Sequence, residues 1–274
     1  MLFTIAFSPC PNDTFIFDAM INHKIDTEGI DFTVSLEDVE TLNNNAISNQ
    51  YDISKISYGA YHKILNNYII LDSGSALGTG VGPLLISKEK KYHEDVNQEA
   101  IAIPGENTTA HFLFSMAFPN AKNKVFLRYD DIEAFVKEGK GLGVIIHENR
   151  FTYHKKGLHK IIDLGDYWEK ITKDPIPLGG IVMRRNIEKP IQQKINRLIQ
   201  KSIAYAYSFY PELNEYIRNN SQEMTDAVMH QHIELYVNDY SKTLGPKGRE
   251  AVLKMLEVFN VDVATASEDY FFVG

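Results

Sequence analysis

The chain has 274 residues, 44% of them hydrophobic and 23% charged, and a formal net charge of -8 at pH 7. This length predicts two lobes of roughly 100 to 150 residues each. The negative charge argues against a nucleic-acid surface, which would need clustered Lys and Arg, and no stretch approaches the length of an apolar membrane span. The chain starts in a predicted strand rather than a signal peptide, and its single cysteine, Cys10, cannot form an internal disulfide. We therefore expect a cytoplasmic protein with a small-molecule partner.

The first predicted strand, residues 2 to 7, leads into a loop in which two prolines flank Cys10, and then into a helix. Asn12 or Asp13 can cap that helix, and the loop offers free backbone N–H groups to an anion or a polar substrate group. A capped helix without further function is the alternative. A nucleophilic role for Cys10 is less favoured because no histidine is close to it in sequence.

A second segment repeats this layout. A short strand ends in Lys55, Ile56 and Ser57 just before another helix, so both loops should open on the same edge of one sheet. The alternatives are that Ser57 is only an N-cap and Lys55 only a solvated charge. The glycine-rich residues 73 to 83 lack the Gly-Lys-Ser/Thr ending of a phosphate-binding loop, so we interpret these glycines as serving close backbone approach or hinge torsions.

A second α/β unit follows a polar run near residue 90. Strands are predicted at residues 100 to 103, 124 to 128 and 142 to 146, with helices at 110 to 117 and 131 to 137. This alternation indicates a mostly parallel sheet covered by helices on both faces. Thr108 and Thr109 lie at a helix entrance, where they can clamp a carboxylate or hydroxyl; ordinary helix capping is the alternative.

His147 and Glu148 follow directly after the strand predicted at residues 142 to 146, and Arg150 comes two residues later. Ligands of open α/β sheets bind beyond the carboxyl ends of the strands, so His147 is the best-placed of the nine histidines for chemistry. A structural or half-buried histidine is the alternative.

The remaining chain predicts a strand near residues 176 to 183 and then three helical regions, at 187 to 209, at 211 to 219 with 224 to 239, and at 246 to 259. His230 and His232 are two residues apart and should point to different faces of a helix, which argues against a metal pair. We expect one lobe from residues 1 to 90 with 184 to 274, and a second from 91 to 183. Crossing segments near 84 to 92 and 176 to 184 would form a hinge beside a cleft.

Five segments together resemble the 1,4-dihydroxy-6-naphthoate synthase family, in order and along essentially the whole chain. These are SPCPNDTF at residues 8 to 15, KISY at 55 to 58, ALGTGVGPL at 76 to 84, the threonine pair at 108 and 109, and IIHENRFTY at 145 to 153. A sister family of the same fold, which makes 3-[(1-carboxyvinyl)oxy]benzoate from chorismate, lacks the first segment. The resemblance implies an α/β, two-lobed fold similar to type II periplasmic binding proteins. It also implies conversion of cyclic dehypoxanthine futalosine to 1,4-dihydroxy-6-naphthoate, on the futalosine route to menaquinone, without metal or redox cofactor.

By the same resemblance, His147 is the proton acceptor, and the substrate contacts are Lys55, Ile56, Ser57, Thr108 and Thr109. Removing a proton from carbon beside an electron-withdrawing group suits a base that titrates near neutrality, and hydroxyl and N–H donors can stabilise the enolate oxygen. We expect Lys55 or Arg150 to pair with a substrate carboxylate, and Glu148 or Asp13 to orient the imidazole.

The competing interpretation is a binding protein, because a two-lobed fold of this kind is most often a solute receptor, and fold does not specify function. A ligand-sensing domain is a further variant of that alternative. A non-catalytic protein would return its ligand unchanged, which a product assay detects. The sequence leaves open whether the protein is a monomer or a homodimer.

Overall fold

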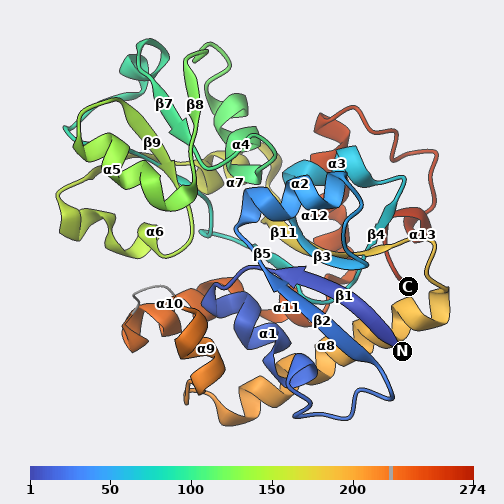
Figure 1. The fold of residues 1–274 in the computed structure, drawn as a ribbon. Helices are drawn as coiled ribbons and strands as arrows, with labels where there is room; N and C mark the ends of the chain where they lie inside the picture. Colours follow the sequence, from blue (N-terminus) through green and yellow to red (C-terminus); the bar gives the residue numbers. More distant parts are fainter. Residues whose placement is uncertain (222–224) are drawn as a thin grey trace.

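The computed structural model describes residues 1 to 221 and 225 to 274, which form two β-sheets with helices packed around each (Figure 1). The first sheet has the strand order β2-β1-β3-β11-β4, with β5 paired to β11, and the second has the order β10-β6-β9-β7-β8. We call the part built on the first sheet lobe 1 and the part built on the second sheet lobe 2. Figure 1 shows lobe 2, in green, beside lobe 1, which contains both chain ends.

Lobe 1 begins with strand–helix units. Its strands are β1 (Leu2–Phe7), β2 (Asp31–Leu36), β3 (Ile53–Ser57), β4 (Tyr68–Ile70), β5 (Ala76–Gly78) and β11 (Ile176–Arg184). The helices α1 (Pro11–Ile21), α2 (Val39–Ile47) and α3 (Tyr58–Ile64) follow β1, β2 and β3. Because β1 is parallel to both β2 and β3, the loops after β1 and β3 open on the same edge of the sheet, as predicted.

Lobe 2 contains β6 (Leu84–Ser87), β7 (Ile101–Ile103), β8 (Lys124–Phe126), β9 (Leu142–Ile145) and β10 (His159–Asp163). Its helices are α4 (Thr109–Ala117), α5 (Ile132–Lys137), α6 (Asn149–Thr152) and α7 (Leu164–Thr172), with short 3-10 turns η1 (His93–Gln98), η2 (Tyr129–Asp131) and η3 (Tyr153–Lys156). The strands β7, β8 and β9 are parallel, whereas β6 runs antiparallel to β9 and β10.

Both sheets are therefore mixed, and the prediction that each is mostly parallel is wrong. The predicted parallel pairing holds for β1, β2 and β3 and for β7, β8 and β9, while β11 is antiparallel to β3, β4 and β5. Antiparallel neighbours need no crossover helix, which suits strands next to the places where the chain changes lobes. The chain passes from one sheet to the other between β5 and β6 and again between α7 and β11. The exact lobe limits stay a prediction.

The chain after β11 is helical and belongs to lobe 1. It forms α8 (Lys189–Phe209), α9 (Glu215–Asn220), α10 (Asp226–Tyr236), α11 (Asp239–Lys242), α12 (Gly245–Val258) and α13 (Glu268–Phe271). The apolar face of α8, with Ile195, Leu198 and Ile199, is fully buried and packs against α1. Residue 224, the first of the helix predicted at 224 to 239, lies outside the described residues, and the described remainder of that helix divides into α10 and α11.

No helix within the described ranges is both long enough and apolar enough to cross a membrane.

Candidate active site

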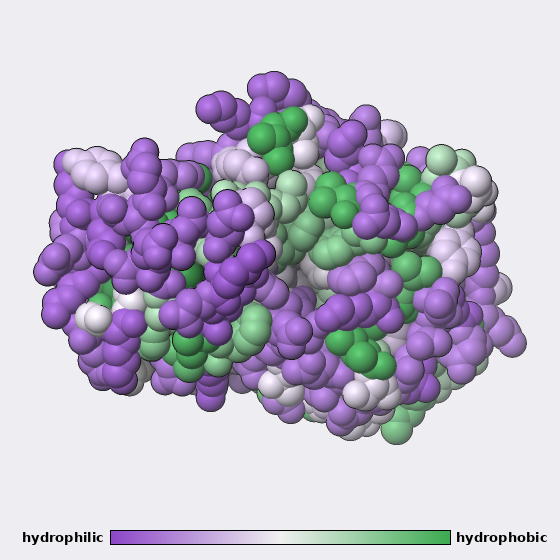
Figure 2. All heavy atoms as spheres, turned by 90° about the horizontal axis from the view of Figure 1, so that it is seen from above, coloured by the Kyte–Doolittle hydropathy of each residue, from purple (hydrophilic) through white to green (hydrophobic). Residues whose placement is uncertain are grey.

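A cavity with about 710 Å³ of atom-free space, counted to its open mouth, lies where loops from both lobes converge. Its wall combines polar groups with an apolar surround: Ser8, Asn12, Asp13, Val39, Leu42, Lys55, Ile56, Ser57, Ala76, Val81, Pro83, Thr108, Thr109, Ala110, Ile146, His147, Leu178, Gly179, His232 and Tyr236. All six residues that the family resemblance assigned to the site line this one cavity. Figure 2 shows one face of the molecule, mostly hydrophilic, with hydrophobic side chains gathered toward a hollow near its middle.

His147 stands at the point where β9 ends, with a backbone φ of 55°. A left-handed conformation is uncommon for a residue with a Cβ, and such strained positions concentrate at functional sites. The side chain is half-buried and lines the cavity. The backbone turn at the strand end thus directs the imidazole into the cavity.

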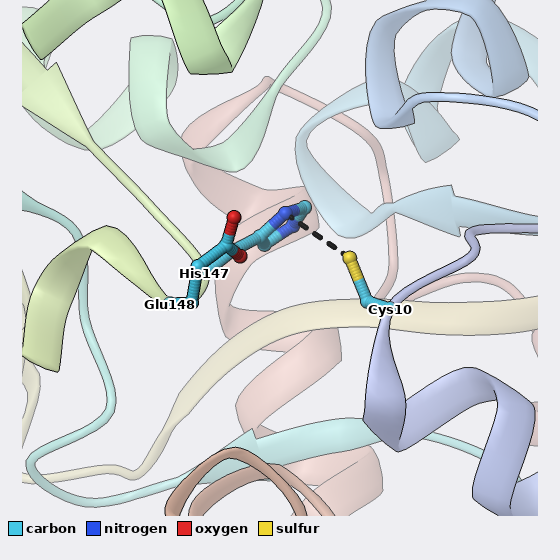
Figure 3. A group of neighbouring side chains, drawn as sticks. All are labelled: Cys10, His147 and Glu148. Carbon is cyan, nitrogen blue, oxygen red and sulfur yellow. Dashed lines mark hydrogen bonds between the residues drawn. The ribbon is translucent and has the colours of Figure 1, made fainter. Parts of the chain in front are cut away.

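The imidazole of His147 meets Cys10 from the other lobe. Its Nδ1 lies 3.4 Å from Sγ of Cys10, as Figure 3 shows. Cys10 belongs to the loop between β1 and α1, so this contact joins lobe 1 to lobe 2. The sequence prediction missed it, because a separation of 137 residues leaves no local signal.

The environment keeps His147 uncharged at neutral pH. Burial lowers the pKa of its imidazole to about 4; Asp13 and Asp38 oppose this shift, and the cation of Lys55 adds to it. Burial also raises the pKa of the Cys10 thiol well above its usual value. The contact between the two side chains is thus one between a neutral thiol and a neutral imidazole.

Asp13 and Lys55 form a buried ion pair in the cavity wall, with Oδ1 and Nζ 3.1 Å apart. Asp13 also accepts hydrogen bonds from Oγ of Ser8 (2.7 Å) and Nδ2 of Asn12 (2.8 Å), while Lys55 donates to the carbonyl of Gly74 (3.0 Å). Lys55 is therefore not a solvated charge. An ammonium group has three donors, and the described residues engage two of them.

The predicted capping role of Asn12 or Asp13 is wrong. Helix α1 begins at Pro11 with Cys10 in the N-cap position, so Asn12 and Asp13 lie in its first turn. Proline starts a helix readily because its missing N–H needs no partner there. The earlier start frees the Asp13 carboxylate to turn back toward Ser8 and Lys55.

Ser57, Thr108 and Thr109 line the cavity, and their polar groups are also hydrogen-bonded within the protein. Asn43 accepts from the backbone N–H of Ser57 (2.8 Å) and donates to its Oγ (3.2 Å). Thr108 caps α4 by accepting from the N–H of His111 (3.1 Å), as the capping alternative expected. Thr109 donates to the carbonyl of Leu178 (2.7 Å), which anchors the start of α4 to β11 in the other lobe. These bonds hold the groups in place at the cavity wall.

Arg150 and Glu148 do not line the cavity with His147. The guanidinium of Arg150 pairs with Asp163 (2.7 Å) and donates to the carbonyls of Gly80 and Gly82, so it holds the glycine-rich loop. Arg150 is thus engaged within the protein, and its pairing with a substrate carboxylate stays a prediction. Glu148 has one buried oxygen, Oε2, without a hydrogen-bond partner in the described part of the chain, and burial raises its pKa.

Neither carboxylate expected to orient His147 is hydrogen-bonded to it. The bonds of Asp13 run to Ser8, Asn12 and Lys55, and the polar contact found for the imidazole within residues 1 to 221 and 225 to 274 is Cys10. The prediction of Asp13 or Glu148 as the orienting group is corrected accordingly, and the structure offers the Cys10 thiol instead.

Cys10, His147 and Glu148 each place one potential ligand atom within 4.8 Å of the others (Figure 3). Thiolate, imidazole and carboxylate are ligands that zinc accepts. In this site the thiol is protonated because burial raises its pKa, and a metal would have to displace that proton. We assign no metal to the group, and the absence of a metal or redox cofactor stays a prediction.

The sequence analysis missed His232 and Tyr236, which α10 adds to the cavity wall. His232 is buried, and its ring centroid lies 6.0 Å from that of His147. The expectation that His230 and His232 point to different helix faces is confirmed, since His230 contacts Tyr210 instead. Their spacing along the helix shows that His230 and His232 lie on different faces, but it does not show which of them faces the cavity.

Comparison with proteins of related sequence shows the family to which the chain belongs. A family model described as "Menaquinone biosynthesis" matches residues 3–260. A 1,4-dihydroxy-6-naphtoate synthase from Thermus thermophilus is 39% identical over 252 residues, covering 92% of this chain and 91% of that protein. A protein of the same name from Streptomyces coelicolor is 36% identical over 259 residues, covering 92% and 90%.

Solved structures agree in fold. A crystal structure from Archaeoglobus fulgidus matches with a TM-score of 0.89 and 32% identity, covering 94% of this chain and 97% of that one. A Candida albicans protein described as having the generic periplasmic binding protein fold matches with a TM-score of 0.64 and 14% identity, covering 98% and 93%. The predicted fold class and the family resemblance are both confirmed: the chain has a periplasmic-binding-protein-like fold and belongs to the menaquinone biosynthesis family in which proteins named 1,4-dihydroxy-6-naphtoate synthase are found.

Proposed function

We propose that this protein is a carbon–carbon lyase that converts cyclic dehypoxanthine futalosine to 1,4-dihydroxy-6-naphthoate, with His147 as the general base. The observation that carries the proposal is the neutral imidazole of His147, half-buried at a strained strand end in the cavity between the lobes. The names of the relatives from Thermus thermophilus and Streptomyces coelicolor support the product, and the enzyme class follows from the chemistry of fragmentation.

The proposed chemistry starts with proton transfer from carbon to the imidazole. When Nδ1 carries the ring hydrogen and donates it to Sγ of Cys10, Nε2 presents its lone pair to the substrate. The C–H electron pair forms a new carbon–carbon double bond, and charge moves onto an oxygen beside it. Formation of the aromatic product supplies the driving force.

The wall around His147 suits the developing negative charge. Lys55 and Ser57 line the same cavity as His147, in a largely apolar surround where hydrogen-bond donors act strongly. The Asp13 carboxylate balances the Lys55 charge before substrate binds, so the site holds an ammonium donor without an unpaired buried cation.

The test is a product assay with purified protein, cyclic dehypoxanthine futalosine and no added cofactor, run beside the His147→Ala variant. We expect naphthoate from the wild type and a loss of at least about 100-fold in kcat for the variant, as is typical for removal of a general base. Near-normal turnover by His147→Ala would contradict the assignment of the base. Substrate recovered intact but bound would instead support a receptor without catalysis.

A further inference from the structure

His232 lines the cavity beside His147, and the reaction as proposed gives it no task. It lies on α10 of lobe 1, and its ring is packed among those of His147, Tyr236 (4.8 Å between centroids) and Phe151 (6.4 Å). Phe151 belongs to α6 of lobe 2, and Figure 1 shows α10 and α6 facing each other. His232 therefore stands where the two lobes meet at the cavity.

One ring nitrogen of His232 lacks a hydrogen-bond partner among the described residues. The side chain is 1% exposed, and its Nδ1 is buried without a hydrogen-bond partner in the described chain. Burial lowers the pKa of His232 well below its usual value, and the neighbouring His147 lowers it further, so the ring is neutral. A neutral ring keeps one N–H donor and one acceptor. Buried polar groups are almost always paired, and an unpaired one in a native protein needs an explanation.

The neighbouring histidine of the same helix shows the contrast. His230 has its Nδ1 3.3 Å from the hydroxyl of Tyr210, and its ring contacts the Tyr210 ring. It lies away from the cavity wall that His232 helps to form. Of these two histidines of α10, the one with an unpaired nitrogen is thus the one that lines the cavity.

We propose that His232 contacts the substrate and donates its ring N–H to the carbonyl oxygen that becomes negative while His147 removes a proton from the adjacent carbon. The inference rests on the proposed function. In this step the proton moves from carbon to His147, the C–H pair becomes a carbon–carbon double bond, and the carbonyl π pair moves onto oxygen. His232 keeps its proton throughout and contributes a hydrogen bond.

The geometry and charge state suit this role. A centroid distance of 6.0 Å allows one small enolising fragment to touch both imidazoles at once. A neutral imidazole is a suitable donor to an enolate oxygen because it can stabilise the charge without protonating the product prematurely. Both rings line the same cavity.

The test compares His232→Phe, which keeps a ring but no donor, with His232→Gln, which restores an N–H, and with His230→Phe as the matched control. For His232→Phe we expect kcat to fall by about 100-fold, as for other lost oxyanion donors, with a smaller change in KM. The melting temperature should stay equal or rise, because an unpaired buried nitrogen has been removed. We expect His232→Gln to recover at least about tenfold of the lost kcat, and His230→Phe to behave as the wild type.

Three outcomes would overturn the inference. One is kcat of His232→Phe within about threefold of the wild type. Another is an absence of recovery in a folded His232→Gln variant. The third is a loss of activity that follows a loss of melting temperature in both His232 variants, which would mean a purely structural role. A wild-type protein that forms no naphthoate would instead refute the proposed function, so the two failures are distinguishable.

Discussion

At the scale of single residues, the site depends on groups that are kept neutral by burial or by pairing. His147 and Cys10 are neutral because each charged form would be poorly solvated, whereas Lys55 keeps its charge beside Asp13. Lys55 is only 7% exposed, so its partner carboxylate is required to offset the cost of burial. A neutral base beside a compensated cation is an arrangement that favours proton abstraction from an anionic substrate.

The low pKa of His147 predicts how kcat/KM falls at acidic pH. Only the neutral imidazole accepts a proton, and burial lowers its pKa to about 4 in the free protein. We therefore expect kcat/KM to be level from pH 7 down to about pH 5 and to fall as the pH drops through about 4. A steady-state pH profile with circular dichroism at each pH checks this. A fall in kcat/KM centred near pH 6.5, the ordinary pKa of histidine, would contradict the lowered pKa of His147 in the free enzyme.

At the scale of elements, the two lobes are joined at a close contact between α3 and α4. The backbone N–H of Gly59 donates to Oγ1 of Thr109 (3.0 Å), and a Cβ at Gly59 would lie 2.9 Å from the backbone nitrogen of Thr109. Backbone atoms cannot move aside as a flexible side chain can, so only glycine fits. This contact sets where the start of α4, and with it the threonine pair, stands in the cavity.

The Gly59 contact predicts a substitution effect that reaches the site. Gly59→Ala should destabilise the protein by about 1 to 3 kcal/mol, as overpacking usually does, and should raise KM by displacing Thr109. Denaturant unfolding and steady-state kinetics measure the two effects. Gly78→Ala is the comparison: its added Cβ would meet only side-chain atoms, Cγ1 of Val81 at 3.3 Å and Nδ2 of Asn238 at 3.4 Å, which can shift, so we expect a smaller loss of stability than at Gly59. Equal behaviour of both variants would argue against a fixed α3–α4 contact.

At the scale of the whole molecule, the cavity wall belongs to both lobes. Lobe 1 contributes the loops after β1 and β3 together with α10. Lobe 2 contributes the start of α4 and the residues at the end of β9. A ligand in this cavity therefore touches both lobes at once and binds poorly when either is unfolded. Binding and the folding of the two lobes are linked for this reason.

This linkage predicts stabilisation by a bound ligand. With the product naphthoate at 100 times its Kd, we expect the free energy of unfolding to rise by about 2.7 kcal/mol. Probes placed in either lobe should report the same rise, since both contribute contacts. Unfolding followed by fluorescence from a reporter in each lobe measures it. A rise confined to one lobe would show that the ligand does not bridge the two.

Much of this protein follows from its local sequence. Alternating apolar strands and helices predicted the two-lobed α/β fold, because hydrophobic period and turn residues act within a few positions. The position of His147 just after a buried strand was enough to select it among nine histidines. The segments SPCPNDTF and IIHENRFTY indicated the family, which the comparisons confirm.

Only the tertiary structure decided the partners of those residues. The contact of Cys10 with His147, the engagement of Arg150 by Asp163 and the glycine-rich loop, and the placement of His232 all join segments far apart in the chain. Helical spacing separates the faces of His230 and His232 but carries no information about which distant loop either face will meet. Such pairings depend on how whole lobes pack, because long-range contacts are set by the burial of complete sheet and helix faces rather than by any local residue pattern.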